Sequence, residues 1–469
     1  MRTDASPPRL TAGPVGLHLR ALAVPMAWGF VALNSYSIAD TYFVGRLGTL
    51  PLAAMGFTFP ITFAMVAAGL GVGIGTSSVI ARLLGTGERE TVQRITTHAL
   101  MLGAAFGLVL LGLGLATIEP VFVALGADGR TLPLITEYMR VYYLGSIFLI
   151  LPMVGNFAIR ATGDAMVPAV ILGLSAVLNV VLDPLLIFGL AGFPRLELQG
   201  AAIATVIANA VTVLASVTVL YRRERLILPG LLRFAGLWDS WRRLLHVGVP
   251  ATATNLLIPV TMAVITALVA GFGPEAVAGF GVASRVESVV FIAVFALQSS
   301  VGPFVGQNCG AGQFDRVTHA VRAATNFLIV YGFVTAVALF VIARPAAALF
   351  DDNPLVVDAA AAYMKIVPFT YGPFGAMMIA VACFNALGRP MPAVVLTFVK
   401  FFGVYLPLAW GLSMLMGLQG IFWANAFSHL AFGVIAFVWL RRCLRTLRAG
   451  RAPAGTSERD RAAVLGPVR

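Results

Sequence analysis

Long apolar runs separated by short polar segments constrain this chain more than any other feature. Each run has about 20 residues or more, which at roughly 1.5 Å per helical residue is enough to cross a bilayer. Since 59% of the 469 residues are hydrophobic and only 11% are charged, a soluble domain is excluded. The sequence predicts an all-α integral membrane protein with twelve transmembrane helices, over 18–44, 51–81, 95–118, 132–158, 167–191, 199–221, 244–271, 276–306, 318–343, 355–386, 391–416 and 418–440.

The net charge of +12 follows the membrane topology rather than a nucleic-acid surface. If the N-terminus is cytoplasmic, 24 of the 32 Lys and Arg residues fall in cytoplasmic segments, and only Arg46, Arg130, Arg195 and Arg344 fall in outside loops. This bias is the positive-inside signal. We therefore expect a multi-pass protein of the inner (cell) membrane, with both termini in the cytoplasm and no nucleic-acid partner.

The second half of the chain repeats the first. "VGRLGTLPLAAMG" (44–56) aligns with "VAGFGPEAVAGFG" (269–281) at an offset of 225 residues, and "DPLLIFGL" (183–190) aligns with "LPLAWGLS" (406–413) at 223. Each half holds six spans, an even number, so the two copies are parallel repeats. Such repeats commonly form two lobes around a central cleft and work by alternating access, which favours a transporter.

This repeat sets the expected domain organisation. The segments are a cytoplasmic N-terminus, a first lobe, a cytoplasmic linker with six Arg, a second lobe and a basic cytoplasmic tail, over 1–17, 18–221, 222–243, 244–440 and 441–469.

Two acidic residues lie inside spans of the first lobe. Asp40 and Asp183 are both in the outer halves of spans that run outward, at similar depth. Asn179 precedes Asp183 by four residues and shares its helix face, and Thr205 of the sixth span falls at the same level. Intramembrane carboxylates are costly, so this cluster is a candidate functional site.

The repeat provides an internal control for these residues. The offsets place Ile265 opposite Asp40 and Leu406 opposite Asp183. If the acids served only to pack a six-span bundle, an equivalent would be expected in the second lobe. Two carboxylates close together in low dielectric cannot both ionise cheaply, so the site can exchange a proton. With the Asn and Thr oxygens it could instead bind Na⁺, and the sequence does not choose between them.

Two ionisable residues lie deep in the second lobe. Glu287 is in the eighth span, and Arg285, two residues before it, does not share its helix face. Lys400 lies nine residues into the eleventh span, too deep to reach the surface easily. We expect both at a cavity or at the interface between the lobes.

Several stretches resemble the multidrug and toxic compound extrusion (MATE) transporters over about residues 18–445. They are "IADTYFVGRLG" (38–48), "RATGDAMVPA" (160–169), "LNVVLDPLLIFG" (178–189), "LQGAAIATVIA" (198–208), "ASRVESVVFIAVFAL" (283–297) and "VGQNCGAG" (305–312). The Asp of the first span and the Asn-x-x-x-Asp of the fifth look like the DinF-like and archaeal branch. The NorM-like branch carries acids in spans 7 and 10, whose membrane interiors have none here.

The resemblance implies roles for individual residues. Asp40, Asn179, Asp183 and Thr205 would form the cation or proton site, with Tyr36, Tyr138 and Asn156 supporting it in the first lobe. It also implies export of amphipathic, often cationic drug-like compounds in exchange for H⁺ or Na⁺, by a lipid-embedded monomer without a cofactor. Lys400 leaves room for anionic substrates.

Two other functions fit the sequence less well. A lipid-linked precursor flippase of the same superfamily typically has fourteen spans and a strongly basic cavity. A membrane-embedded enzyme acting on lipids needs a polar catalytic cluster at one interface, and the sequence offers none. We therefore expect a transporter and not an enzyme.

Overall fold

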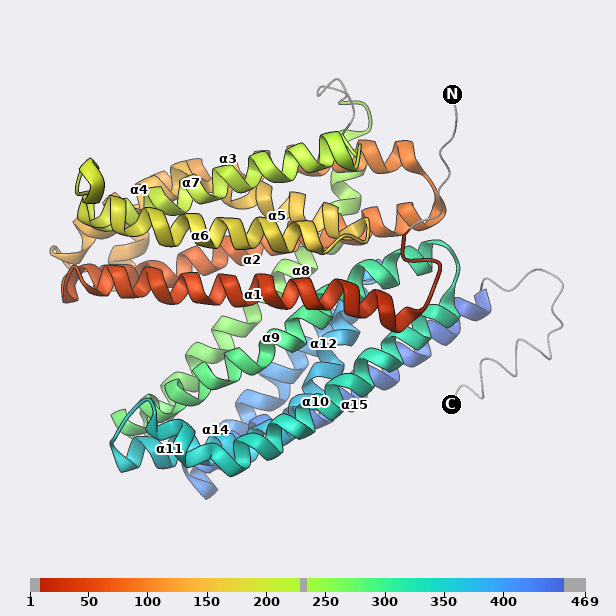
Figure 1. The fold of residues 1–469 in the computed structure, drawn as a ribbon. Helices are drawn as coiled ribbons and strands as arrows, with labels where there is room; N and C mark the ends of the chain where they lie inside the picture. Colours follow the sequence, from red (N-terminus) through yellow and green to blue (C-terminus); the bar gives the residue numbers. More distant parts are fainter. Residues whose placement is uncertain (1–8, 228–233, 451–469) are drawn as a thin grey trace. The chain divides into compact units, whose positions relative to one another are not determined.

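The computed structural model describes residues 9–227 and 234–450, and these residues are predominantly α-helical (Figure 1). Eleven helices of the described chain are long and apolar enough to cross a membrane. A twelfth span consists of α4 (Thr131–Leu144) and α5 (Ser146–Ala161), which meet at a bend of 47°. The predicted all-helical membrane fold is confirmed, and the predicted run over 132–158 is this bent pair.

The chain divides into two compact units, and the first comprises Ala21–Thr252. Within this first unit α6 packs along α7, and α5 packs against both α2 and α3. Its helices are α1 (Val15–Gly45), α2 (Thr49–Thr86), α3 (Arg89–Ala124), α4, α5, α6 (Met166–Phe188), the short η1 (Leu190–Gly192), α7 (Glu197–Thr218) and the π-helical turn η2 (Val219–Arg223).

The second unit comprises Met1–Arg20 and Ala253–Arg469. Here α12 packs along α15 and α10, and α11 packs along α9. The helices that follow the first repeat are α8 (Leu237–Ala270), α9 (Pro274–Gly310), α10 (Phe314–Ala348), α11 (Pro354–Ile366), η3 (Val367–Thr370), α12 (Tyr371–Ala386), α13 (Met391–Phe398), the π-helical η4 (Val399–Tyr405), α14 (Leu406–Met416) and α15 (Leu418–Gly450).

The boundaries between the units fall inside helices α1 and α8 rather than in the polar segments expected from the sequence. Residues 9–14, just before α1, are held within the second unit, where Arg316 donates hydrogen bonds to the carbonyls of Leu10 and Gly13. The side chain of Gln307 also accepts the backbone N–H of Leu10 at 3.1 Å. The tail beyond residue 450 lies outside the described residues.

The packing of both units repeats the symmetry of the sequence. A Cβ on Gly107 of α3 would lie 2.8 Å from the Cα of Ile147, where α5 begins. At the repeat offset of 225, a Cβ on Gly332 of α10 would lie 2.5 Å from the backbone N of Gly372, where α12 begins. Each contact is too close for any side chain. Because the same glycine contact occurs in both units, the repeat of sequence is also a repeat of three-dimensional packing.

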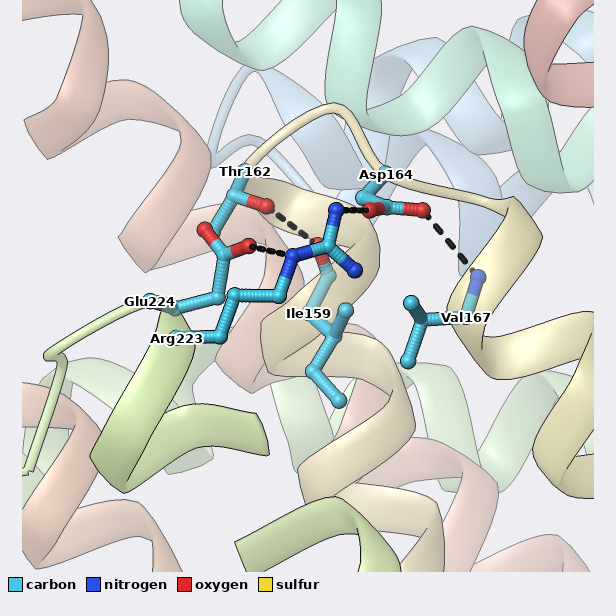
Figure 2. Close-up of polar contacts among 6 residues, drawn as sticks. All are labelled: Ile159, Thr162, Asp164, Val167, Arg223 and Glu224. Carbon is cyan, nitrogen blue, oxygen red and sulfur yellow. Dashed lines mark hydrogen bonds and ion pairs between the residues drawn. The ribbon is translucent and has the colours of Figure 1, made fainter. Parts of the chain in front are cut away.

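An ion pair joins the turn between α5 and α6 to η2, the π-helical turn that follows α7 (Figure 2). The guanidinium of Arg223 lies 2.7 Å from a carboxylate oxygen of Asp164 and 3.8 Å from Glu224. The other oxygen of Asp164 accepts the backbone N–H of Val167 in the first turn of α6. These contacts fix one end of the helix pair that carries the candidate site.

The start of α4 is fixed by Asp128 in the loop before it. Its carboxylate accepts the backbone N–H and the hydroxyl of Thr131, each at 2.8 Å, and the N–H of Arg130 at 3.1 Å. These hydrogen bonds, led by the one from the Thr131 backbone, lower the pKa of Asp128 from its ordinary value. The charged cap therefore forms at neutral pH and holds the helix that presents Tyr138 to the site.

Candidate functional site

Three helices of the first unit bring the predicted site residues to one level. Helix α1 lies along α6, because Gly29 faces Ala169 near one end and the Phe43 ring lies 6.3 Å from that of Phe188 near the other. Helix α6 in turn packs along α7. Asp40, on α1, and Asp183, on α6, are therefore close enough to interact electrostatically.

The acids are buried and only partly hydrogen-bonded. Asp183 has no exposed surface, and neither of its carboxylate oxygens has a hydrogen-bond partner in the described part of the chain. Asp40 is 8% exposed, and its buried Oδ1 also lacks a partner there. Asn179 donates its Nδ2 to the hydroxyl of Thr205 at 3.2 Å, which leaves its own Oδ1 without a donor among the described residues.

A cavity of about 170 Å³ lies beside these acids. Tyr138 and Tyr142, one turn apart on α4, stack on its wall with ring centroids 5.9 Å apart. The residues that line it come from α1, α2, α4 and α7, and are Tyr36, Ser37, Asp40, Thr41, Met55, Thr58, Phe59, Thr62, Phe63, Val66, Tyr138, Tyr142 and Thr205.

This arrangement fits a site for a small cation. The oxygens without donors on Asp40, Asn179 and Asp183 are hard acceptors, and buried acceptors of this kind need either a proton or a bound cation. Na⁺ would be held by the two carboxylates together with the amide and hydroxyl oxygens. H⁺ would instead bind to one of the carboxylates, and the geometry is compatible with either ion.

The structure places most, but not all, of the predicted site residues together. Tyr36 and Tyr138 line the cavity, as the resemblance implied. Asn156 does not line it: its side chain accepts the hydroxyl of Ser216 at 3.3 Å, eleven residues further along α7 than Thr205 and hence about 16 Å away along the axis. Asn156 therefore joins α5 to α7 at another level.

Sequence reasoning missed several cavity residues. Tyr142 follows Tyr138 by four residues, so the helical period alone could have predicted that the two rings share a face. Thr58 and Thr62 on α2 are also separated by one turn. A threonine in an apolar helix carries little signal, because its hydroxyl can bond to the backbone of the preceding turn. Both do so here, with Met55 and Phe59.

The two ionisable residues of the second lobe are also buried. Glu287 on α9 is 8% exposed and Lys400 on η4 has no exposed surface. Arg285 is exposed, in agreement with the expectation that it does not share the face of Glu287. The side chains of Glu287 and Lys400 therefore lie in the interior of the second unit.

Comparisons with known proteins agree with the fold. A family profile described as MatE matches residues 25–185 and again 250–410. A Shewanella oneidensis protein named FAD transporter is 38% identical over 94% of this chain and 98% of its own length. The probable multidrug resistance protein YoeA of Bacillus subtilis is 27% identical over 90% of this chain and 94% of its own.

Solved structures of transporters share the fold. That of the Vibrio cholerae MATE transporter VcmN in the bent form superposes with a TM-score of 0.87 at 28% identity, and covers 92% of this chain and 98% of its own. The two six-span repeats, together with these matches, define a multi-pass membrane transporter. The chain belongs to the MatE family, whose members are efflux transporters and not enzymes. Its assignment to the DinF-like branch stays a prediction.

We expect Asp183→Asn to leave the protein at least as stable as the natural form. The substitution removes a buried charge whose oxygens have no donors within the described residues, so it should raise the free energy of unfolding by roughly 1 kcal/mol at neutral pH. Thermal unfolding of the purified protein at neutral pH measures this.

Asp164→Asn is the matched control for this prediction. It weakens the contacts with Arg223 and with the N–H of Val167, so it should lower the free energy of unfolding by about 1 kcal/mol. If Asp183→Asn destabilised the protein as much as the control does, Asp183 would be a structural residue rather than an ion-binding one.

Proposed function

We propose that this protein is a secondary-active exporter that couples the outward movement of a small organic molecule to the inward movement of H⁺ or Na⁺ at Asp40 and Asp183. One observation carries the proposal. Two buried carboxyl groups lie beside a polar cavity, and three of their oxygens have no hydrogen-bond donor in the described chain. Such groups change their charge when an ion binds, and this change can favour one conformation over another.

The coupling requires that ion and substrate favour different states of the first unit. Asp40 lines the cavity, and Asp183 interacts electrostatically with Asp40 and with Tyr138 of the cavity wall. An ion that neutralises the acids therefore alters the field that a substrate in this cavity meets. Ion and substrate therefore change each other's affinity for this unit, and such coupling is what an antiporter needs.

Asp40→Asn and Asp183→Asn should each abolish ion-driven export while leaving the protein in the membrane. An Asn mimics the neutral state and cannot gain or lose a proton, so the ion gradient no longer drives export. We expect the rate of ion-driven export to fall by roughly 5–150-fold, the range that is typical of coupling energies. The measurement is efflux in proteoliposomes under an imposed pH or Na⁺ gradient. A response to the pH gradient alone would identify H⁺ as the ion.

Glu137→Gln is the control for the coupling test. Glu137 is on α4, which also lines the cavity, but its side chain is exposed. This variant should respond to the gradients like the natural protein. Undiminished ion-driven export in both Asp variants would contradict the proposed coupling site.

FAD, or a similar flavin nucleotide, is the substrate that we propose first. The relative named FAD transporter is 38% identical to this chain, whereas the relatives named as multidrug proteins in Bacillus subtilis and Staphylococcus aureus are 27% and 25% identical. Tyr36, Tyr138, Tyr142 and two Phe residues line the cavity, and aromatic walls suit flat ring systems. Amphipathic, cationic drug-like compounds are the second candidate, supported by the multidrug relatives and by Asp40.

The natural protein should therefore transport FAD in preference to a cationic aromatic dye such as ethidium. The transport rates of FAD and of ethidium are measured from the fluorescence of each compound as it moves into or out of proteoliposomes under the same ion gradient. Protein-free liposomes and the Asp40→Asn variant are the controls. Transport of ethidium without FAD would favour the multidrug function, and transport of neither would contradict both substrates.

We also propose that the protein lies in the cell membrane with both termini in the cytoplasm. The clustering of Lys and Arg in alternate segments supports this orientation. It places Ala235, just before α8, in the cytoplasm, and Gly129, in the loop before α4, outside.

A membrane-impermeant thiol reagent should label Gly129→Cys but not Ala235→Cys in intact cells. Both positions are exposed, so accessibility to solvent does not distinguish them. The background is a variant in which Cys309, Cys383 and Cys443 are replaced by Ala. Labelling of the cysteine at position 235 alone would reverse the orientation, and with it the direction of transport.

A further inference from the structure

The second unit contains a buried acid that the proposed coupling site does not use. Both carboxylate oxygens of Glu287 lie 3.0 Å from the hydroxyl of Tyr363 on α11, and Tyr371 on α12 lies close enough to this carboxylate to interact with it electrostatically. Glu287 is 8% exposed, and Tyr363 and Tyr371 are 2% exposed each. The acid is thus held by phenol groups inside the helix bundle rather than paired with a surface cation.

The same bundle contains a buried ammonium group. Lys400 has no exposed surface, and its Nζ has no hydrogen-bond partner in the described part of the chain. It lies 3.9 Å from the ring centroid of Phe401 and 4.8 Å from that of Phe374. Ring faces attract a cation, but they cannot accept its three N–H groups as water does. Lys400 also lies on η4, and π-helical turns are frequent at functional sites.

Glu287 and Lys400 interact without direct contact. Each contributes to the electrostatic environment of the other, yet no ion pair within 4.0 Å joins them among the described residues. The pair is electrically neutral in two ways: with both groups ionised, or with both uncharged after one proton has moved from the ammonium to the carboxylate. The low dielectric of the interior favours both of these neutral states. The proton can therefore move between the ammonium and the carboxylate when the distance between the two groups changes.

The repeat places two residues of this cluster, Glu287 and Tyr363, at positions equivalent to residues that line the cavity of the first unit. At the offset of 225 residues, Glu287 corresponds to Thr62 and Tyr363 to Tyr138, and both Thr62 and Tyr138 line that cavity. The glycine contacts at Gly107 and Gly332 obey the same offset, so the correspondence holds in the packing as well as in the sequence. Glu287 and Tyr363 therefore occupy positions equivalent to cavity residues of the first unit, with an acid where that unit has a threonine.

We propose that Glu287 and Lys400 form a second proton-exchange site, inside the second unit, that gains and releases one proton in each transport cycle. A proton taken from water leaves the pair with a neutral acid and an ammonium, and its release to water restores the neutral pair. Only the role of this site in transport rests on the proposed function; the proton exchange itself does not. The consequence is that more charge moves per substrate than the first-unit acids alone would carry.

Few other titratable groups face this pair. His429 on α15 stacks on Phe374 at 4.4 Å and bonds to Thr370, and Tyr405 lies one turn from Lys400. On α10, Tyr331 donates to the carbonyl of Val290. The other charged side chains on neighbouring helices have different contacts: Lys365 lies over the Phe340 ring, and Asp358 pairs with Arg344 at the surface.

Infrared difference spectroscopy of the purified protein during a pH titration tests the site without any transport. The natural protein should show the band of a protonated carboxylic acid that Glu287→Gln removes and that Lys400→Met moves to another pH. Tyr363→Phe keeps the packing and deletes only the hydroxyl on the carboxylate, so it should also move the pH midpoint of this band. The Tyr363→Phe variant therefore still tests the site if the Glu287 or Lys400 variant fails to fold.

The role in transport is tested by the substrate gradient that proteoliposomes sustain under a fixed pH difference. The double variant Glu287→Gln/Lys400→Met should sustain a smaller ratio of substrate concentrations across the membrane. We expect this ratio to fall about tenfold for each unit of pH difference, because each coupled proton contributes one factor of ten per pH unit. The control is Asp358→Asn/Arg344→Met, which removes an exposed acid–base pair from the same unit and should change nothing.

The outcomes separate this proposal from the first one. If the Glu287 and Lys400 variants matched the natural protein and the control in both the infrared titration and the gradient, the pair would be structural and the proposal overturned. An infrared signal with an unchanged gradient would overturn its role in transport. Failure of the Asp40 and Asp183 variants to affect coupling would instead contradict the proposed function, while the infrared test of Glu287 would still stand.

Discussion

A hydrocarbon surrounding offers no hydrogen-bond partners, and most features of this protein depend on that constraint. Every span is helical because a helix satisfies its own backbone. Most hydroxyl side chains within the spans, such as Thr76 and Thr212, bond back to the carbonyl of the preceding turn. Against this background, a buried side chain without a partner is costly, and Asp183 and Lys400 are the clearest cases in the described chain. Each has to be explained by something that binds to it or by a proton that it exchanges.

The two units separate what the fold requires from what the function requires. The close glycine contacts at Gly107 and Gly332 occur in both, so the packing of a six-span bundle depends on them. The acids do not recur. Ile265, which corresponds to Asp40, has no exposed surface and packs in the apolar core of the second unit. A bundle of this kind is thus built with an isoleucine at that place, so its packing does not require the acid that the first unit carries there, in agreement with the proposed coupling role of Asp40.

The sequence predicted the fold well because its main signals are strong in a membrane protein. The length of the apolar runs predicted the spans, and a constant offset predicted the repeat. The site residues Asp40, Asp183, Asn179 and Thr205 could be predicted because polar groups are rare at that depth and the helical period tells which of them share a face. Their mutual placement, with Asn179 donating to Thr205, needed only two adjacent helices.

The remaining features depend on tertiary contacts that no local pattern encodes. Asn156 resembles a site residue in sequence, but the packing of α5 on α7 pairs it with Ser216. Glu287 gave no sign of its partner, because Tyr363 lies 76 residues further along the chain. The boundary of the units inside α1 could not be foreseen either, since the contacts that hold Leu10 come from residues near 307–316.

The chemistry of the two interiors explains why one scaffold needs both. In the first unit Asp40 lines the cavity and Asp183 lies close enough to interact with it, so a bound cation would lower the cost of burying both acids; under the proposed function, this unit responds to ion concentration. In the second unit an acid and a base lie apart among aromatic rings, so the pair is already neutral without a ligand. Its charge changes only when a proton enters or leaves. Under the two proposals, the two units therefore have separate means of responding to the same ion gradient.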